Sequence, residues 1–256
     1  MSFRSRMFIL LAAGTVLTGC STTSRHGLDP GAKAHLDSVD LHFTIPQYEL
    51  NAATEAPVAG HLIGGIIGGL VNAAIDNERA DEAMRLLGPI RDRLIDYDHT
   101  GALKSRIASE LDGIDWLGVD EVVLNRHASE TRYPEALEIT SADAVAFIDA
   151  EYSLTPNFDS LTTSAFVIVY ARDEALFPYR RLQPSLDEPE FNQSTYIYRN
   201  RFEVTTAVAG GEDKEVNAAA LAAPGSEVVR DALESNAAAI ARRIAEDLEH
   251  GSGNRG

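Results

Sequence analysis

Alternating apolar and polar residues mark a first strand and a hairpin. Residues 39–45 place their apolar side chains on one face of a strand, which Pro46 ends. Residues 144–154 and 160–171 alternate in the same way, and residues 155–159, between them, are of the types that favour turns. These two segments therefore predict a long antiparallel hairpin.

Apolar residues recur at helical spacing in three other segments. Residues 77–95 predict a helix in which Pro89 causes a kink or starts a new turn, and residues 102–111 predict a shorter helix. A Pro-Gly-Ser sequence precedes a long C-terminal helix that reaches Leu248. Its apolar residues form a single stripe: Val229, Leu233, Ala237, Ile240, Ile244 and Leu248.

Two further strands complete the predicted sheet. Residues 119–124 are rich in valine, and residues 195–204 alternate tyrosine and phenylalanine with arginine and glutamate, which indicates a strand with one solvent-exposed face. We therefore predict an α+β fold, with helices packed on a mainly antiparallel sheet. Residues 34–249 are expected to form one domain, followed by a disordered tail, residues 250–256.

The N-terminus has the pattern of an export signal. Arg4 and Arg6 precede an apolar run, residues 7–17, that is too short to span a bilayer as a helix. The sequence Leu17-Thr18-Gly19-Cys20 resembles a complete bacterial lipobox. The resemblance implies a signal peptide, residues 1–19, cleaved before Cys20, and a diacylglycerol anchor with palmitate-type acyl chains on the Cys20 sulfur. The alternative is an ordinary cleaved signal with a coincidental cysteine.

The residues that follow Cys20 predict location and partners. Ser21 stands where aspartate often marks inner-membrane retention, so the lipobox resemblance favours the periplasmic face of a Gram-negative outer membrane. Residues 20–33 are expected to form the lipidated end and a flexible tether. The formal net charge is -17, and loss of Arg4 and Arg6 with the signal peptide takes it to -19. Such a charge excludes nucleic acid and leaves the bilayer, envelope proteins or a second copy as expected partners.

The order of the predicted elements loosely resembles one class of envelope proteins. It is similar to the small periplasmic domains of outer-membrane lipoproteins such as the curli secretion lipoprotein and the activators of cell-wall synthases. No motif makes this similarity specific, so no functional residue is carried over from it.

A glycine-rich apolar segment, residues 58–75, is the first candidate site. Its glycines recur at small-xxx-small spacing and would allow close helix contacts: Gly60, Gly64, Gly65, Gly68 and Gly69. One interpretation is self-association or membrane contact. The other is a buried segment whose glycines allow close approach to the sheet.

A group of aromatic and basic residues is the second candidate site. The residues that would contact a partner are Tyr179, Arg180, Arg181, Arg199 and Arg201. Tyrosine and arginine are the residues that most often anchor interfaces and stack on sugars. The alternative is that Tyr196 and Tyr198 face the core while Arg199 and Arg201 are ordinary strand exteriors.

No motif predicts a metal, a cofactor or a catalytic residue. Residues 96–101 open like a calcium loop, but Ile107 stands where a bidentate glutamate is required, so Asp98 or Thr100 is expected to cap a helix instead. The sequence therefore favours a non-enzymatic scaffold or assembly component of an envelope complex. The alternatives are a binding module for a small ligand or a cell-wall glycan and, third, a hydrolase.

Overall fold

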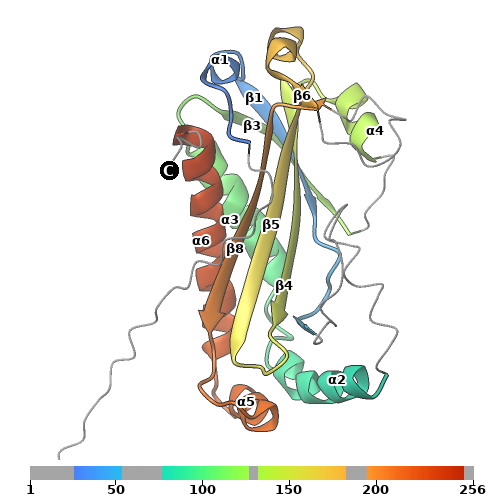
Figure 1. Cartoon of the computed structure of the whole chain (residues 1–256), viewed down its shortest axis with the longest axis vertical. Coiled ribbons are helices and arrows are strands. Elements are labelled where there is room, and N and C mark those ends of the chain that lie inside the picture. Colours follow the sequence, from blue (N-terminus) through green and yellow to red (C-terminus); the bar gives the residue numbers. More distant parts are fainter. Residues whose placement is uncertain (1–25, 54–76, 127–131, 183–194, 251–256) are drawn as a thin grey trace, which may run out of the picture.

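A long sheet with helices packed on it forms the body of the protein (Figure 1). The computed structural model describes residues 26–53, 77–126, 132–182 and 195–250. The five main strands lie in the order β3-β1-β4-β5-β8. Their bounds are β1 Ser38–Thr44, β3 Gly118–Asn125, β4 Ala144–Leu154, β5 Ser160–Ala171 and β8 Tyr198–Ala207. Three two-residue strands are β2 Asn51–Ala52, which pairs with β4, and β6 Arg181–Leu182, which pairs with β7 Thr195–Tyr196.

The α+β prediction is confirmed, but the sheet is mixed rather than mainly antiparallel. β1 lies between β3 and β4 and runs parallel to both, whereas β4, β5 and β8 are antiparallel neighbours. The predicted hairpin is β4 and β5, in register from Ala144 opposite Ala171 to Leu154 opposite Leu161. The chain makes helices between β1 and β3 and between β3 and β4, and such crossovers allow parallel pairing.

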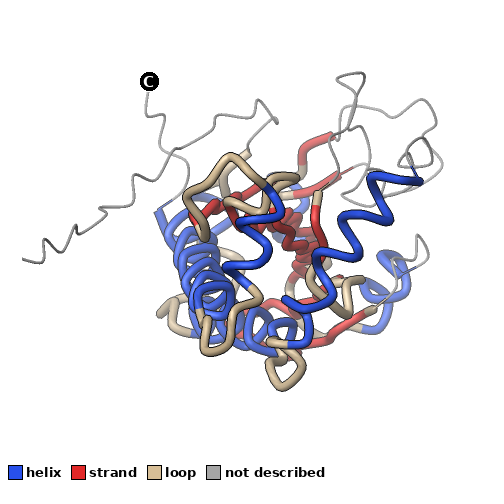
Figure 2. Tube along the Cα trace, turned by 90° about the horizontal axis from the view of Figure 1, so that it is seen from below, coloured by secondary structure: helices blue, strands red, loops and turns tan. Residues whose placement is uncertain are grey.

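Two long helices cover one face of the sheet (Figure 2). The helices are α1 Pro30–Lys33, α2 Asn77–Asp92, α3 His99–Asp112, α4 Arg132–Ile139, α5 Lys214–Leu221 and α6 Val228–His250, with the 3-10 helix η2 Glu174–Tyr179. α3 and α6 pack against each other, and α6 also packs on β5 and β8. α2 continues through Pro89. Asp98 caps α3 by accepting a hydrogen bond from the Gly101 amide, as predicted.

The predicted apolar stripe of α6 is buried along its length against the sheet. The inward residues of β4 and β5 are the predicted ones, and they share one core with α3 and α6. One tyrosine of the last predicted strand lies elsewhere. Because the chain bends at Ile197, Tyr198 packs in the main core, whereas Tyr196 packs on the opposite face with Phe147 and Tyr170.

Two polar side chains of α6 are buried against the sheet. Asn236 accepts a hydrogen bond from the Thr206 hydroxyl at 2.6 Å and donates to the Leu161 carbonyl at 3.2 Å. Asp247 accepts hydrogen bonds from the Tyr198 hydroxyl and the Asn200 amide, at 2.7 and 2.8 Å. These bonds fix the position of α6 on β8.

Residues 26–33 are packed on the domain, and so this part of the expected flexible tether is corrected. The backbones of His26 and Arg199 exchange hydrogen bonds of 2.9 and 3.0 Å. Leu28 and Ala32 are buried in the main core. Burial removes these apolar side chains from water, which favours the packed segment over a free one. Cys20 lies outside the described residues.

The five glycines proposed for self-association also lie outside the described residues. Within the described ranges, no helix combines the length and the apolar composition that crossing a membrane requires.

Candidate functional site

Four residues from separate segments meet at one end of the sheet. His26 precedes α1, Arg181 is in β6, Tyr196 is in β7 and Arg199 is in β8. Arg181 is paired with Tyr196 across the two short strands, and His26 is bridged to Arg199. We call these four residues the cationic cluster.

The rings and guanidinium groups of the cluster are in contact. The ring centroids of His26 and Tyr196 lie 5.7 Å apart. The Arg199 guanidinium lies 6.0 Å from the Tyr196 ring and 5.1 Å from the ring of Phe166, a residue of β5. Two aromatic faces therefore hold the Arg199 charge in one place, since a cation is attracted to the face of a ring.

The cluster has excess positive charge and unused hydrogen-bond donors. Burial lowers the pKa of His26, and the charges of Arg181 and Arg199 lower it further. Tyr196 is fully buried and its hydroxyl has no hydrogen-bond partner among the described residues, nor has Nε of Arg199. The guanidinium groups of Arg181 and Arg199 make this end of the sheet locally positive, and an anion placed here would be attracted to them.

Arg180 and Tyr179, two of the predicted interface residues, lie beside the cluster at the end of η2. The Arg180 guanidinium lies 3.2 Å from the ring of Phe177 and donates to the Ala171 carbonyl at 2.9 Å. Tyr179 stacks on His35, with 6.1 Å between ring centroids. Phe177 is 39% exposed, so an aromatic ring and a cation are presented together at this end.

Arg201 belongs to a different part of the same sheet face. It lies opposite Phe166 and near Glu151, whose pKa its charge lowers. Burial has the larger effect on Glu151 and raises its pKa overall. Arg201 is thus near a carboxylate, and the five predicted residues do not form one uniform surface.

The alternative interpretation of this strand is correct in part. Tyr196 and Tyr198 are both fully buried, as it required, but against opposite faces of the sheet. Arg199 and Arg201 are half-buried on the outer face. The sequence did not identify His26 or Phe166 as members of the site. His26 lies far from the arginines in sequence, and no local spacing could have indicated that contact.

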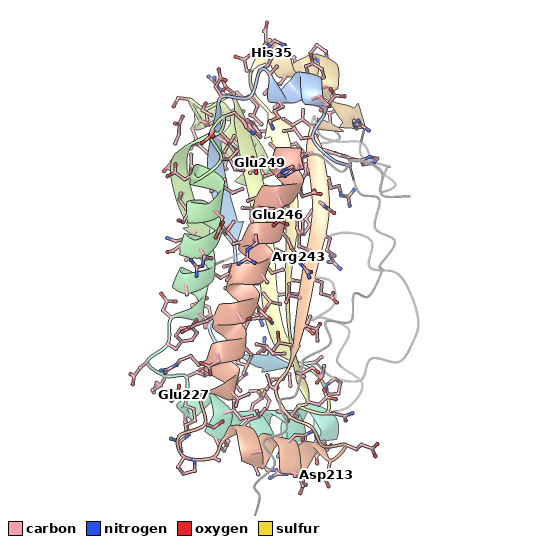
Figure 3. The ribbon with its side chains drawn as sticks, turned by 90° about the vertical axis from the view of Figure 1, so that its left-hand side faces the viewer. His35, Asp213, Glu227, Arg243, Glu246 and Glu249 are labelled. Atoms are coloured by element: carbon pink, nitrogen blue, oxygen red, sulfur yellow. The ribbon has the colours of Figure 1, made fainter. Side chains whose placement is uncertain are left out.

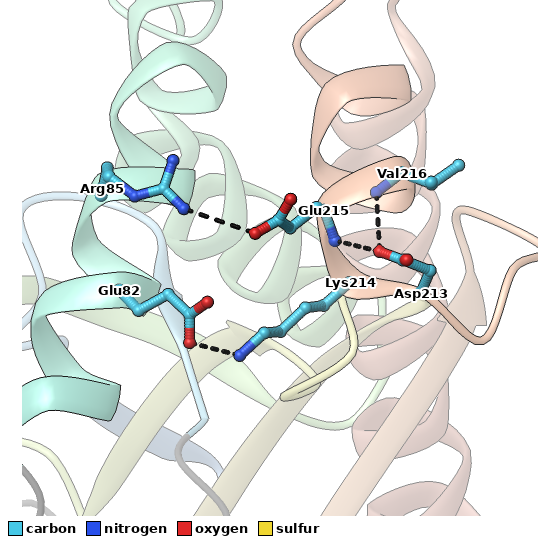
Figure 4. A network of polar contacts seen from close by, with 6 residues as sticks. All are labelled: Glu82, Arg85, Asp213, Lys214, Glu215 and Val216. Atoms are coloured by element: carbon cyan, nitrogen blue, oxygen red, sulfur yellow. Dashed lines mark hydrogen bonds and ion pairs between the residues drawn. The ribbon is translucent and has the colours of Figure 1, made fainter.

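A cleft of about 520 Å³ lies at the opposite end of the domain. Its apolar lining includes Ala83, Leu86 and Phe158. Glu212, Asp213, Lys214 and Glu215 form a mostly acidic rim. Lys214 pairs with Glu82 and Arg85 pairs with Glu215, so these ion pairs join α2 to α5 beside the cleft (Figure 4).

A third polar group is enclosed rather than accessible. His99 is 4% exposed and packs edge to face on Tyr152. The Arg126 guanidinium donates to Thr100 and to the Gln47 carbonyl, at 3.2 and 3.0 Å. These contacts join the start of α3 to the segments that follow β1 and β3. Among the described residues, no three or more His, Cys, Asp or Glu side chains are grouped so that they could hold a metal ion.

Comparison with known proteins identifies only distant similarities. No protein-family model matches the chain, and no curated protein matches it. The PelC dodecamer of Paraburkholderia phytofirmans has 13% identity and a TM-score of 0.33, covering 92% of this chain and 97% of that one. A provisionally assigned lipoprotein of Caulobacter crescentus CB15 has 13% identity and a TM-score of 0.25, covering 57% and 96%. A hypothetical protein of Chlamydia trachomatis has 12% identity and a TM-score of 0.28, covering 82% and 96%. These similarities are too distant to assign a family or a function.

Proposed function

We propose that the protein is a lipid-anchored, non-enzymatic assembly component of the bacterial envelope. Cys20 carries the anchor, and the domain faces the periplasm from the outer membrane. The observation that carries the proposal is the cationic cluster: Arg181 and Arg199 lie close together on a chain of net charge -17, and such a pair is suited to docking an acidic component of the envelope.

Two positions at opposite ends of the domain allow this role to be tested in intact cells. A photoreactive residue replaces Phe177 in one strain and Val216 of α5, which is 62% exposed, in another. An assembly component should give a crosslinked product with an envelope protein or with a second copy from at least one position. Absence of such products from both positions would contradict the proposal.

The anchor is tested separately with Cys20→Ser. The wild-type protein should fractionate with membranes and carry acyl chains detectable by mass spectrometry of its N-terminal peptide. The variant should be released into the soluble periplasmic fraction. A variant that stays fully membrane-bound would show that the lipid on Cys20 is not the anchor.

The cleft favours a second candidate function, a binding module for a small ligand or a glycan. Its volume of about 520 Å³ is within the range of small-molecule sites, and it combines an apolar lining with a polar rim. A binding module should be stabilised in thermal unfolding by soluble muropeptides. Such stabilisation should be lost when the cleft is filled by Ala83→Trp. Equal stabilisation of wild type and Ala83→Trp would place the ligand elsewhere.

A further inference from the structure

We propose that the cationic cluster binds the phosphate groups of anionic phospholipids on the membrane in which Cys20 is anchored. The domain would then lie with this end toward the bilayer. The inference deepens the proposed function and rests on it, because it takes Cys20 to be lipidated.

The chemistry of the cluster fits a phosphate group. Arg199 is held between the rings of Phe166 and Tyr196, and its Nε has no partner in the described part of the chain. The Tyr196 ring is fully buried and supports the Arg199 guanidinium from within the domain. Arg181 is exposed beside them. Guanidinium groups form charge-assisted, often bidentate, hydrogen bonds to phosphate oxygens.

The position of the cluster along the chain brings it within reach of the headgroups. His26 is a member of the cluster and comes six positions after Cys20. Six residues of fully extended chain span at most about 20 Å. With Cys20 acylated, the His26 backbone therefore cannot lie farther than this from the point at which the anchor enters the membrane. The arginines beside His26 are then within reach of the headgroup region.

The surroundings of the cluster are those of a membrane interface. Phe177 is 39% exposed and lies under the Arg180 guanidinium. Ile139, the last residue of α4, is 81% exposed, and α4 lies at the same end of the sheet (Figure 1). Aromatic and apolar side chains beside arginine are typical of segments that rest in the headgroup region.

The acidic rim of the cleft lies at the other end of the domain, although η2 itself begins with the exposed carboxylates of Asp173 and Glu174. The acidic rim of the cleft includes Glu212, Asp213 and Glu215. Figure 3 shows His35 and Asp213 at opposite ends of the molecule, so the rim is far from the end that carries η2. Because anionic headgroups attract the cluster and repel the acidic rim, the cleft would be turned toward the periplasm.

Vesicle sedimentation of the mature chain tests the proposal without the anchor. The protein is residues 20–256 with Cys20→Ser, which keeps every described residue. It should sediment at low ionic strength with vesicles of phosphatidylethanolamine and phosphatidylglycerol, and remain in solution with phosphatidylcholine vesicles. High salt should release it. Failure to bind the anionic vesicles, or equal binding to the neutral ones, would overturn the proposal.

Two matched double variants assign the binding to the cluster. Arg181→Gln with Arg199→Gln should weaken partition by about 30-fold, since each arginine near an anionic surface contributes roughly a fivefold effect. Arg106→Gln with Arg242→Gln removes the same charge from exposed positions on α3 and α6 and should weaken it less than threefold. Equal losses in the two variants would mean that only total charge matters, and the proposal would fail.

Inorganic phosphate distinguishes a membrane surface from a soluble ligand. If millimolar phosphate raises the thermal stability of wild type but vesicles do not bind, the cluster is a site for a free oxyanion and the membrane proposal is overturned. The proposed function would survive that result, because acylation of Cys20 and crosslinking are measured independently. In cells, a photoreactive residue at position 177 should label phospholipid, whereas one at position 216 should label protein.

Discussion

The imidazole of His99 lies edge to face on the ring of Tyr152, with 4.3 Å between the centroids and 81° between the planes. His99 is 4% exposed at the start of α3, and neither ring nitrogen has a hydrogen-bond partner among the described residues. Burial lowers its pKa to about 4, while the charge of Asp98 acts in the opposite direction. A neutral ring therefore packs α3 against β4 at pH 7.

The folded state should become more stable as the pH rises from about 4 to about 6.5. In this window the unfolded chain holds a proton on His99 that the folded chain lacks, so the free energy of unfolding increases with pH. The difference between 6.5 and about 4 corresponds to about 3 kcal/mol between the two ends of the window. Urea denaturation at a series of pH values measures this slope.

The substitution His99→Phe isolates the contribution of this one ring. Phenylalanine keeps an aromatic ring against Tyr152 but cannot take up a proton, so the rise in the free energy of unfolding across this window should be smaller by about the same 3 kcal/mol. The exposed Ser235, which carries no ionisable group, serves as the control, and Ser235→Ala should leave the pH dependence unchanged. Parallel stability curves for wild type and His99→Phe would contradict the assignment.

Removing the Asn236 amide should destabilise the fold by about 2 to 3 kcal/mol. The substitution Asn236→Ala leaves the Thr206 hydroxyl and the Leu161 carbonyl without their bonds in a fully buried position. The neighbouring Ser235 is exposed, and Ser235→Ala should change the free energy of unfolding by less than about 0.5 kcal/mol. Chemical denaturation compares the two, and equal effects would mean that Asn236 has no special role.

Local sequence patterns predicted the strands and the C-terminal helix well because those elements repeat a simple period. The inward residues of β4 and β5 and the stripe of α6 follow from alternation and helical spacing alone. The parallel pairing of β1 with β3 and β4 does not, because it depends on where helical crossovers return the chain. Periodicity also does not predict the bend at Ile197, which places Tyr196 on the opposite face of the sheet from Tyr198.

The candidate site was predicted less completely than the fold. Tyrosine and arginine in one short segment indicated an interface, and Arg181 and Arg199 do lie close to one another through His26 and Tyr196. The polar composition of residues 21–33 predicted a tether, yet Leu28 and Ala32 are buried. One leucine and one alanine among breakers give no periodic signal, although they are buried where the backbone of His26 pairs with that of Arg199.

The packing of α1 on η2 should be sensitive to one added methyl group. A Cβ at Gly31 would lie 2.5 Å from Cε1 of Tyr179, so Gly31→Ala should force the tyrosine away from His35. We expect a loss of about 1 to 2 kcal/mol in the free energy of unfolding. Trp116, the single tryptophan, lies 4.7 Å from the Lys33 ammonium and reports the change by fluorescence.

The background of Tyr179→Ala provides the control for this prediction. Without the tyrosine ring, the extra methyl group should be neutral or stabilising by up to about 1 kcal/mol, because alanine has a higher helix propensity than glycine. Gly210→Ala should be tolerated, since nothing lies within 4 Å of its added Cβ. If Gly31→Ala costs the same with and without Tyr179, the clash is not the cause.

The helix that carries the rim of the cleft depends on its cap. Asp213 accepts hydrogen bonds from the amides of Glu215 and Val216 at 2.8 and 3.2 Å (Figure 4). Asp213→Ala should destabilise the protein by about 1 kcal/mol, and Asp213→Asn by only a few tenths, because asparagine is an equally good cap. The loss should be local. Faster amide hydrogen exchange should therefore extend through α5, where Lys214 pairs with Glu82 of α2. An equal loss in Asp213→Asn would mean that the carboxylate charge rather than the cap stabilises this end, and exchange confined to the first turn would mean that α5 does not open as a unit.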